Sequence, residues 1–133
     1  MPSLVADTHS AIWYFLKSSR LSDRARAAIN NALAGGDAVY LSSITLVEIV
    51  YLIEKGRLPS DAADTLEDGI QDPGSRWVLV PLDLAVAQTV SKIQRSLIPD
   101  MPDRIIAATA LHLGLPLVTR DSKINASGLK TIW

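Results

Sequence analysis

The chain has 133 residues, 48% of them hydrophobic, and its 13 basic and 14 acidic side chains give a formal net charge of −1 at pH 7. This composition excludes a disordered chain, and the absence of cysteine excludes disulfide bonds and cysteine-ligated zinc. Proteins that bind nucleic acid by neutralising many phosphates are basic, so any contact with nucleic acid should here be local or use metal ions.

Signals for export or membrane insertion are absent from the sequence. Residues 1–5 lack the basic flank and long apolar core of a signal peptide. No apolar run approaches the roughly 20 residues that a membrane-spanning helix needs. We therefore expect a single domain over residues 1–133, located in the cytoplasm and without membrane contact.

Short apolar runs alternate with helix-forming segments along the chain. The first run, over residues 3–7, is typical of a strand buried on both faces of a parallel sheet. In chain order we expect strands over 3–7, 38–41, 77–80, 115–119 and 129–132, and helices over 8–16, 23–33, 44–55, 59–70, 84–97 and 104–113. This alternation predicts an α/β fold whose parallel sheet, of about five strands, carries helices on both faces.

The helix expected over 44–55 is apolar nearly all round, and Glu48 is the only acid between residues 42 and 53. A helix without a polar face is normally buried on more than one side. In so small a domain this indicates an interface with a second subunit or with a partner.

Acidic residues follow or precede the expected strands at one edge of the sheet. Asp7 ends the first strand, and Asp121 follows the fourth. Asp103 begins the helix that leads into the fourth strand, and Glu48 lies one turn inside its apolar helix. Because the carboxyl ends of parallel strands share one edge, where ligands bind in such sheets, these side chains should meet there.

Each acid also has a local interpretation. Asp7 and Asp103 can cap the helices that follow them, and Asp121 can stabilise a turn. Glu48 can pair with Arg104 or with Arg120. The local interpretations weaken when taken together, because independent caps would have no reason to gather at one edge.

A cluster of such carboxylates needs a cation or raised pKa values. Two ionised carboxylates about 5 Å apart repel by roughly 3 kcal/mol at an effective dielectric constant of ~20. Carboxylate oxygens without cysteine suit a hard divalent ion, Mg²⁺ or alternatively Mn²⁺.

Four segments, over residues 4–9, 40–49, 102–110 and 117–121, carry a resemblance to a known family. In this order and over nearly the whole chain, the sequence resembles PIN-domain ribonucleases, in particular the VapC-type toxin of a VapBC toxin–antitoxin pair. The resemblance implies a PIN-like three-layer sandwich and a Mg²⁺-dependent endoribonuclease toxin. It also implies an RNA substrate, a cognate antitoxin protein whose C-terminal segment lies across the site, and a homodimer.

By this resemblance, Asp7, Glu48, Asp103 and Asp121 form the family's acidic quartet. Asp7 and Asp103 would bind the metal directly, whereas Asp121 and Glu48 would act through metal-bound water. Asp100 stands where many members carry a further acid, and we assign it a secondary role. Cleavage would leave a 5′-phosphate and a 3′-hydroxyl.

Four neighbours of these acids are candidates for substrate contact. Thr8 and Thr119 can hydrogen-bond to carboxylates or to substrate. Arg104 and Arg120 can contact phosphate, although pairing with neighbouring acids is an equal alternative.

Several other functions fit less well. A catalytically silent PIN-like module that binds RNA or protein is the first alternative, and the complete quartet argues against it. A haloacid-dehalogenase phosphatase needs Asp-x-Asp after the first strand, where this chain has Asp7, Thr8 and His9. A phosphate-binding P-loop and the acids and lysine of a receiver domain are missing. His9 and His112 lie too far apart for a metal-free acid–base mechanism. Trp13, Tyr14 and Phe15 can stack on bases, but consecutive helix positions cannot share one face, so core packing is the better interpretation for some of them.

Overall fold

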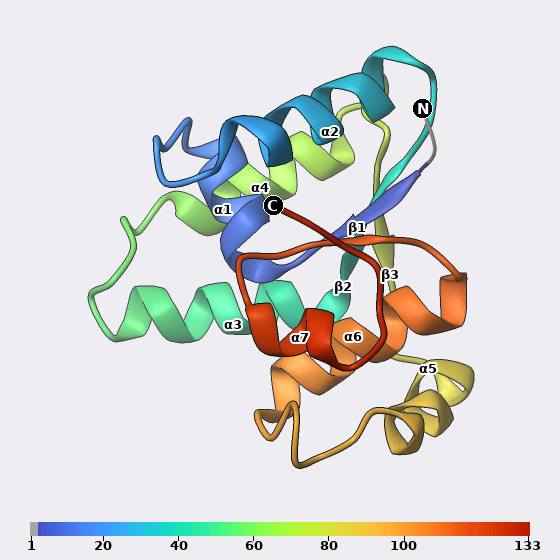
Figure 1. Cartoon of the computed structure of the whole chain (residues 1–133). Coiled ribbons are helices and arrows are strands. Elements are labelled where there is room, and N and C mark those ends of the chain that lie inside the picture. The colour runs from blue at the N-terminus through green and yellow to red at the C-terminus, as the bar shows by residue number, and fades with distance from the viewer. Residues whose placement is uncertain (1–2) are drawn as a thin grey trace.

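The computed structural model describes residues 3–133, and its centre is a five-stranded sheet (Figure 1). The strands are β1 (Leu4–Ala6), β2 (Val39–Ser42), β3 (Trp77–Val80), β4 (Leu117–Val118) and β5 (Thr131–Ile132). Their order in the sheet is β3-β2-β1-β4-β5, and every neighbouring pair is parallel. The expected α/β fold with a parallel sheet of five strands is therefore confirmed.

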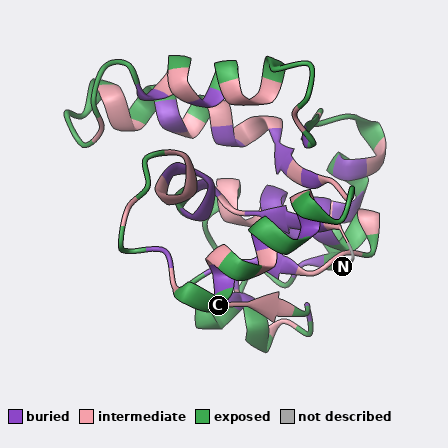
Figure 2. Cartoon of the chain, turned by 90° about the horizontal axis from the view of Figure 1, so that it is seen from above, coloured by how far each residue is buried: buried purple, intermediate pink, exposed green. Residues whose placement is uncertain are grey.

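Helices cover both faces of this sheet. They are α1 (Thr8–Phe15), α2 (Asp23–Ala34), α3 (Ser43–Glu54), α4 (Ala62–Gln71), α5 (Leu84–Thr89), the 3-10 turn η1 (Val90–Lys92), α6 (Met101–Leu113) and α7 (Ser122–Ala126). One hydrophobic core joins the sheet to α1, α2 and α4, and a second joins it to α6 and α7. Figure 2 shows the buried positions gathered in the sheet and on the helix faces turned toward it.

Strand β1 divides the two cores. Leu4 and Ala6 point into the first core, whereas Val5 points into the second, and all three are buried. This alternation is the two-residue period of a strand that is covered on both faces. Because β1 lies between β2 and β4, its carboxyl end is the centre of the edge where the acids gather.

The structure corrects three local predictions. The helix expected over 84–97 ends at Thr89 and continues only as the short turn η1, because Ile93 adopts an extended conformation with ψ of 120°. Helix α7 was not expected from the sequence. Helix α6 begins at Met101 with Asp100 as its N-cap, so the prediction that Asp103 caps this helix is wrong.

Helix α3 is less buried than its sequence suggests. Only Thr45 and Ile49 of this helix are buried, and Val47, Val50 and Tyr51 are exposed, with Val47 at 49%. The apolar face is therefore left open within a single chain. Across residues 3–133, no helix is both long enough and apolar enough to cross a membrane.

Candidate active site

Asp7 lies at the carboxyl end of β1 and is fixed there by the backbone. Its N–H donates to the carbonyl oxygen of Val118 at 3.1 Å, which joins the ends of β1 and β4. Its side-chain Oδ1 accepts a hydrogen bond from the N–H of Ser10 at 2.9 Å and so caps α1. Asp7 can therefore cap α1 and also belong to the acidic cluster, because the cap uses only one of its two carboxylate oxygens.

Asp121 is positioned in a similar way after β4. Its Oδ1 accepts from the N–H of Lys123 at 2.9 Å and caps α7. Its own N–H donates to Oγ1 of Thr119 at 3.1 Å, and Thr119 is buried. Thr119 therefore sets the turn that carries Asp121.

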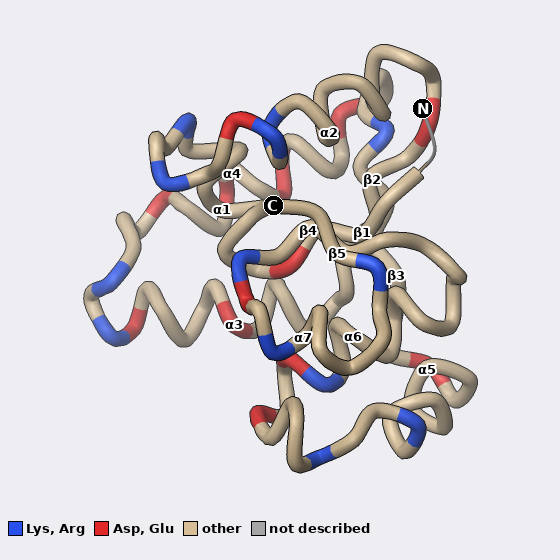
Figure 3. The backbone as a smooth tube through the Cα atoms, viewed as in Figure 1, with Lys and Arg blue, Asp and Glu red and all other residues tan. Residues whose placement is uncertain are grey.

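Helix α6 brings two further acids to the same place. Asp100 accepts a hydrogen bond from the N–H of Asp103 at 3.2 Å, and this cap places Asp103 in the first turn of the helix. Burial raises the pKa of Asp103 to about 7, helped by the negative charges of Asp100, Glu48, Asp7 and Asp121. The acids of the predicted quartet, together with Asp100, therefore share one electrostatic environment. Figure 3 shows acidic and basic positions close together around α6 and α7.

Glu48, the acid contributed by α3, is held in place by hydroxyl groups. Thr8 Oγ1 donates to Glu48 Oε1 at 2.6 Å, and Thr45 Oγ1 lies 3.0 Å from Thr8 Oγ1. Burial raises the pKa of Glu48, the hydrogen bond from Thr8 lowers it, and the charges of Asp100 and Asp7 raise it further. Thr45 was missed in the sequence, although a threonine one turn before a lone acid in an apolar helix is a usable signal.

The two predicted arginines differ in their surroundings. Arg104 Nη2 donates to the carbonyl oxygens of Val90 and Ile93 at 3.1 and 2.8 Å, so this guanidinium holds the chain after α5. Arg120 instead is exposed and lines a cavity with the acids. Substrate contact stays a prediction for both, but the structure gives Arg104 another role.

Two cavities adjoin the acidic cluster. The larger, of about 440 Å³, contains Asp7, Asp103 and Asp121, together with Arg120 and Ile124. Its other lining residues, His9, Trp13 and Arg20, come from α1 and the loop that follows it.

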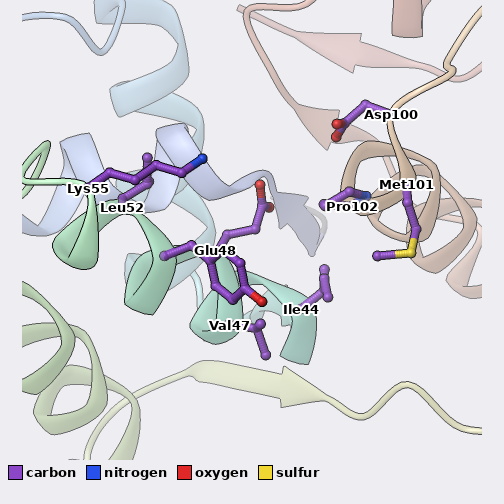
Figure 4. Close-up of a pocket in the computed structure, with 9 residues that line it drawn as sticks. Ile44, Val47, Glu48, Leu52, Lys55, Asp100, Met101 and Pro102 are labelled. Carbon is purple, nitrogen blue, oxygen red and sulfur yellow. The ribbon is translucent and has the colours of Figure 1, made fainter.

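The smaller cavity, of about 330 Å³, runs along α3 (Figure 4). Glu48 and Asp100 lie at opposite walls of it, beside the apolar side chains of Ile44 and Val47 and the amine-bearing Lys55. The acidic cluster therefore lies between the larger cavity, which is more polar, and the smaller one, which is more apolar. We call the smaller cavity the groove along α3.

The chemistry of these side chains suits a hard divalent cation. Carboxylate oxygens are the preferred ligands of Mg²⁺ and Mn²⁺. Burial is the main cause of the raised pKa of Asp103, and a cation would relieve the repulsion from neighbouring acids that adds to it. Within residues 3–133, no three His, Asp or Glu side chains are spaced to hold one ion directly. Mg²⁺ commonly keeps several waters and takes only one or two protein carboxylates. The residues present therefore fit a cation that is bound in part through water.

A comparison with protein families matches residues 4–128 to the PIN domain. The chain belongs to the PIN domain family. The resemblance indicated by the sequence is thereby confirmed. Ribonuclease VapC22 of Mycobacterium tuberculosis is 29% identical to this PIN domain over 126 residues, which cover 95% of this chain and 92% of that protein.

Solved structures agree on the fold. A chain of the VapBC2 complex from Rickettsia felis, bound to a DNA fragment from its promoter, matches with a TM-score of 0.72 and 16% identity, over 98% of this chain and 97% of that chain. A chain of FitAcB from Neisseria gonorrhoeae matches with a TM-score of 0.63 and 26% identity, over 98% and 96% of the two chains. The PIN fold thus covers nearly the whole chain.

Proposed function

We propose that this PIN domain is a Mg²⁺-dependent endoribonuclease, with Mn²⁺ as an alternative ion, and the toxin of a type II toxin–antitoxin system. The observation that carries the proposal is the convergence of Asp7, Glu48 and Asp121 on Asp103, from four separate parts of the chain. The similarity to Ribonuclease VapC22 supports the same conclusion.

In this mechanism, Asp7 and Asp103 would hold the cation directly, and Asp121 and Glu48 would act through water molecules beside it. The bound ion supplies Lewis-acid polarisation of a phosphodiester and lowers the pKa of a water molecule. Glu48, oriented by the hydroxyl of Thr8, would accept a proton from the attacking water. As the new P–O bond forms, the bond between phosphorus and the 3′ oxygen breaks, and the departing oxygen takes up a proton from solvent. The products would be a 5′-phosphate and a 3′-hydroxyl.

Cleavage of a fluorogenic RNA with Mg²⁺ or Mn²⁺ tests the proposal. We expect cleavage by the wild type, and a loss of about two orders of magnitude or more in Asp7→Ala and Asp103→Asn. Asp64→Asn is the matched control, because Asp64 is an exposed acid of α4 outside the cluster. RNA binding without metal-dependent cleavage would instead support the silent binding module.

We further propose an antitoxin as the partner, with one of its segments seated in the groove along α3. The groove offers apolar contacts from Ile44 and Val47 directly beside Glu48. The VapBC complexes among the structural neighbours support a partner of this kind. Val47→Lys should abolish inhibition by the cognate antitoxin, while leaving RNA cleavage intact.

A homodimer completes the proposal. Strand β3 is an edge of the sheet, and exposed apolar residues follow one another along it and after it. They are Val78, Leu79, Leu82 and Leu84, the last 73% exposed. Light scattering and sedimentation at micromolar concentrations should give a dimer for the wild type and a monomer for Leu84→Glu. A strict monomer for the wild type would remove this part of the proposal.

A further inference from the structure

One wall of the larger cavity is aromatic. His9 and Trp13 lie one turn apart on α1, and their ring centroids are 5.5 Å apart at 48°. Trp13 is supported from behind by Trp133, in an edge-on contact with centroids 5.9 Å apart. Trp13 is half-buried and His9 is exposed. The wall is therefore fixed by packing but open toward the cavity.

Two arginines line the same cavity. Arg20 belongs to the loop between α1 and α2, and Arg120 follows β4. The loop is ordered by contacts within the protein, because Arg26 Nη2 donates to the carbonyl oxygen of Ser18 at 2.7 Å and the N–H of Arg20 donates to Ser18 Oγ at 3.2 Å. In the part of the chain that the structure describes, neither Arg20 nor Arg120 forms a salt bridge.

The cavity thus combines three kinds of group within about 440 Å³: flat rings, cationic side chains and the carboxylates of Asp7, Asp103 and Asp121. An RNA nucleotide has a part that complements the rings and a part that complements the cationic side chains. Its base stacks on aromatic rings, and its phosphates pair with guanidinium groups. The three carboxylates repel phosphate unless a cation is bound beside them. Since that cation would also hold the bond to be cut, the nucleotide in this cavity should be one next to that bond.

We propose that this cavity is a subsite for one unpaired RNA nucleotide. Its base stacks on Trp13 and His9, and its phosphates contact Arg20 and Arg120. A base inside a duplex has both faces covered by its neighbours, so the subsite selects single-stranded RNA. The proposal rests on the proposed nuclease function and adds the residues that hold the base and the phosphates beside the bond to be cut. It also explains how a chain of net charge −1 binds RNA, namely by two local cations.

Binding of fluorescein-labelled eight-nucleotide RNAs, followed by anisotropy in Mg²⁺, tests the subsite. The Asp103→Asn protein is used throughout, because it does not cut the RNA and because the lost carboxylate weakens the repulsion of phosphate that a cation would otherwise have to offset. One abasic nucleotide is placed at each position in turn, and binding is measured with Trp13 intact and with Trp13→Leu. At one position, the abasic change should weaken binding about five- to a hundredfold with Trp13 intact and have no further effect with Trp13→Leu.

Variants of exposed residues keep the test independent of folding. Arg20→Gln should weaken binding and lower the slope of log affinity against log salt by about 0.7, the value for one single-strand phosphate contact. His9→Ala should weaken binding without changing that slope. Arg95→Gln is the matched control, because Arg95 is exposed and outside both cavities, and it should change neither quantity.

Equal affinity for a duplex and a single strand would overturn the subsite, as would the absence of any abasic position coupled to Trp13. Failure of the nuclease proposal looks different. If wild-type protein cuts no RNA but the coupling to Trp13 is measured, the subsite stands and the nuclease assignment falls. If the wild type cuts RNA with metal but no coupling to Trp13 is measured, the nuclease assignment stands and the subsite falls.

Discussion

The hydroxyl of Thr8 donates a 2.6 Å hydrogen bond to Oε1 of Glu48 and thereby joins the start of α1 to α3 across the acidic edge. Thr45 Oγ1 lies 3.0 Å from Thr8 Oγ1. Because a hydroxyl has a single proton, and that of Thr8 goes to the carboxylate, Thr45 is the donor in this second bond. Two buried hydroxyls thus point their protons in series toward Glu48.

This series predicts a positioning role for Thr8. Thr8→Val keeps the size of the side chain but removes the donor to Glu48. Loss of a group that orients a metal-site carboxylate typically lowers activity about 10- to 100-fold. We expect that loss in the rate of RNA cleavage at saturating Mg²⁺, with recovery in Thr8→Ser. A Thr8→Val protein as active as the wild type would show that Glu48 needs no such support.

Thr45→Val is the weaker companion change. It leaves the bond between Thr8 and Glu48 but removes the donor that fixes the hydroxyl of Thr8. The rate of RNA cleavage should fall by less than in Thr8→Val, and Thr45→Ser should restore it. If Thr45→Val and Thr8→Val were additive, the two hydroxyls would act separately and not in series.

The raised pKa of Asp103 predicts how stability depends on pH. Its pKa rises from 3.8 to about 7 on folding, so the folded protein holds this proton more tightly than the unfolded chain. Stability without metal therefore falls as the pH rises from about 4 to 7, because ionisation of Asp103 is opposed in the folded state. Asp103→Asn removes the cost of ionising this side chain in the folded protein.

Chemical unfolding in EDTA measures this effect. Asp103→Asn should be more stable than the wild type at pH 8 by about 1–2 kcal/mol, a value discounted for solvent screening because the carboxyl is half-buried. The difference should shrink toward pH 5. Addition of Mg²⁺ should stabilise the wild type and leave the variant nearly unchanged. A variant less stable than the wild type at pH 8 in EDTA would contradict the assignment.

We expect Arg104 to act chiefly on stability. Its guanidinium donates to the carbonyl oxygens of Val90 and Ile93, and hydrogen bonds from a charged group contribute about 1.5–3 kcal/mol. Arg104→Met keeps the packing of the stem but should lower the free energy of unfolding by about 2–3 kcal/mol. Denaturant unfolding measures the loss.

Arg120→Gln is the matched comparison for this prediction. Arg120 is exposed, so stability should change by less than about 0.5 kcal/mol. RNA affinity should fall, and its salt dependence should become shallower. If Arg104→Met changed the salt dependence and Arg120→Gln did not, the roles of the two arginines would be exchanged.

The gathering of acids was predictable from the sequence, because the order of apolar runs and helices fixes where strands end. Asp7 and Asp121 follow buried strands, and a parallel sheet places such ends on one edge. Local detail was less accessible. Asp100 and Asp103 both suit the first turn of a helix, and only the path of the loop before Met101 decides that Asp100 is the cap.

Contacts between distant segments were inaccessible for a related reason. Arg20 lies in a polar stretch that carries no periodicity, and its place beside the acids depends on the packing of α1 and α2 against the sheet. For Arg104 the sequence offered contact with phosphate or pairing with a neighbouring acid as equal alternatives. In the structure its guanidinium donates to backbone carbonyls of the segment after α5, which no side-chain pattern marks.

The contact between Gly69 and Phe15 gives a last prediction, on packing away from the active site. A Cβ atom at Gly69 would clash with Cε1 of Phe15, whose ring packs against Trp77 with centroids 4.6 Å apart and planes tilted by 48°. Gly69→Ala must therefore displace the ring, and overpacking of this kind costs about 1–3 kcal/mol. The better helix propensity of alanine offsets about 1 kcal/mol of that cost.

We expect a net loss of about 1 kcal/mol for Gly69→Ala, measured by thermal and denaturant unfolding. Gly74→Ala is the matched control in the turn before β3, since a Cβ atom there meets only Asp72 Oδ1, at 3.8 Å. That control should be neutral within about 0.5 kcal/mol. RNA cleavage should be unchanged in both variants, because neither glycine lines the cavities that contain the acids. A stabilised Gly69→Ala protein would mean that Phe15 moves aside freely, and that its contact with Trp77 contributes little to the core.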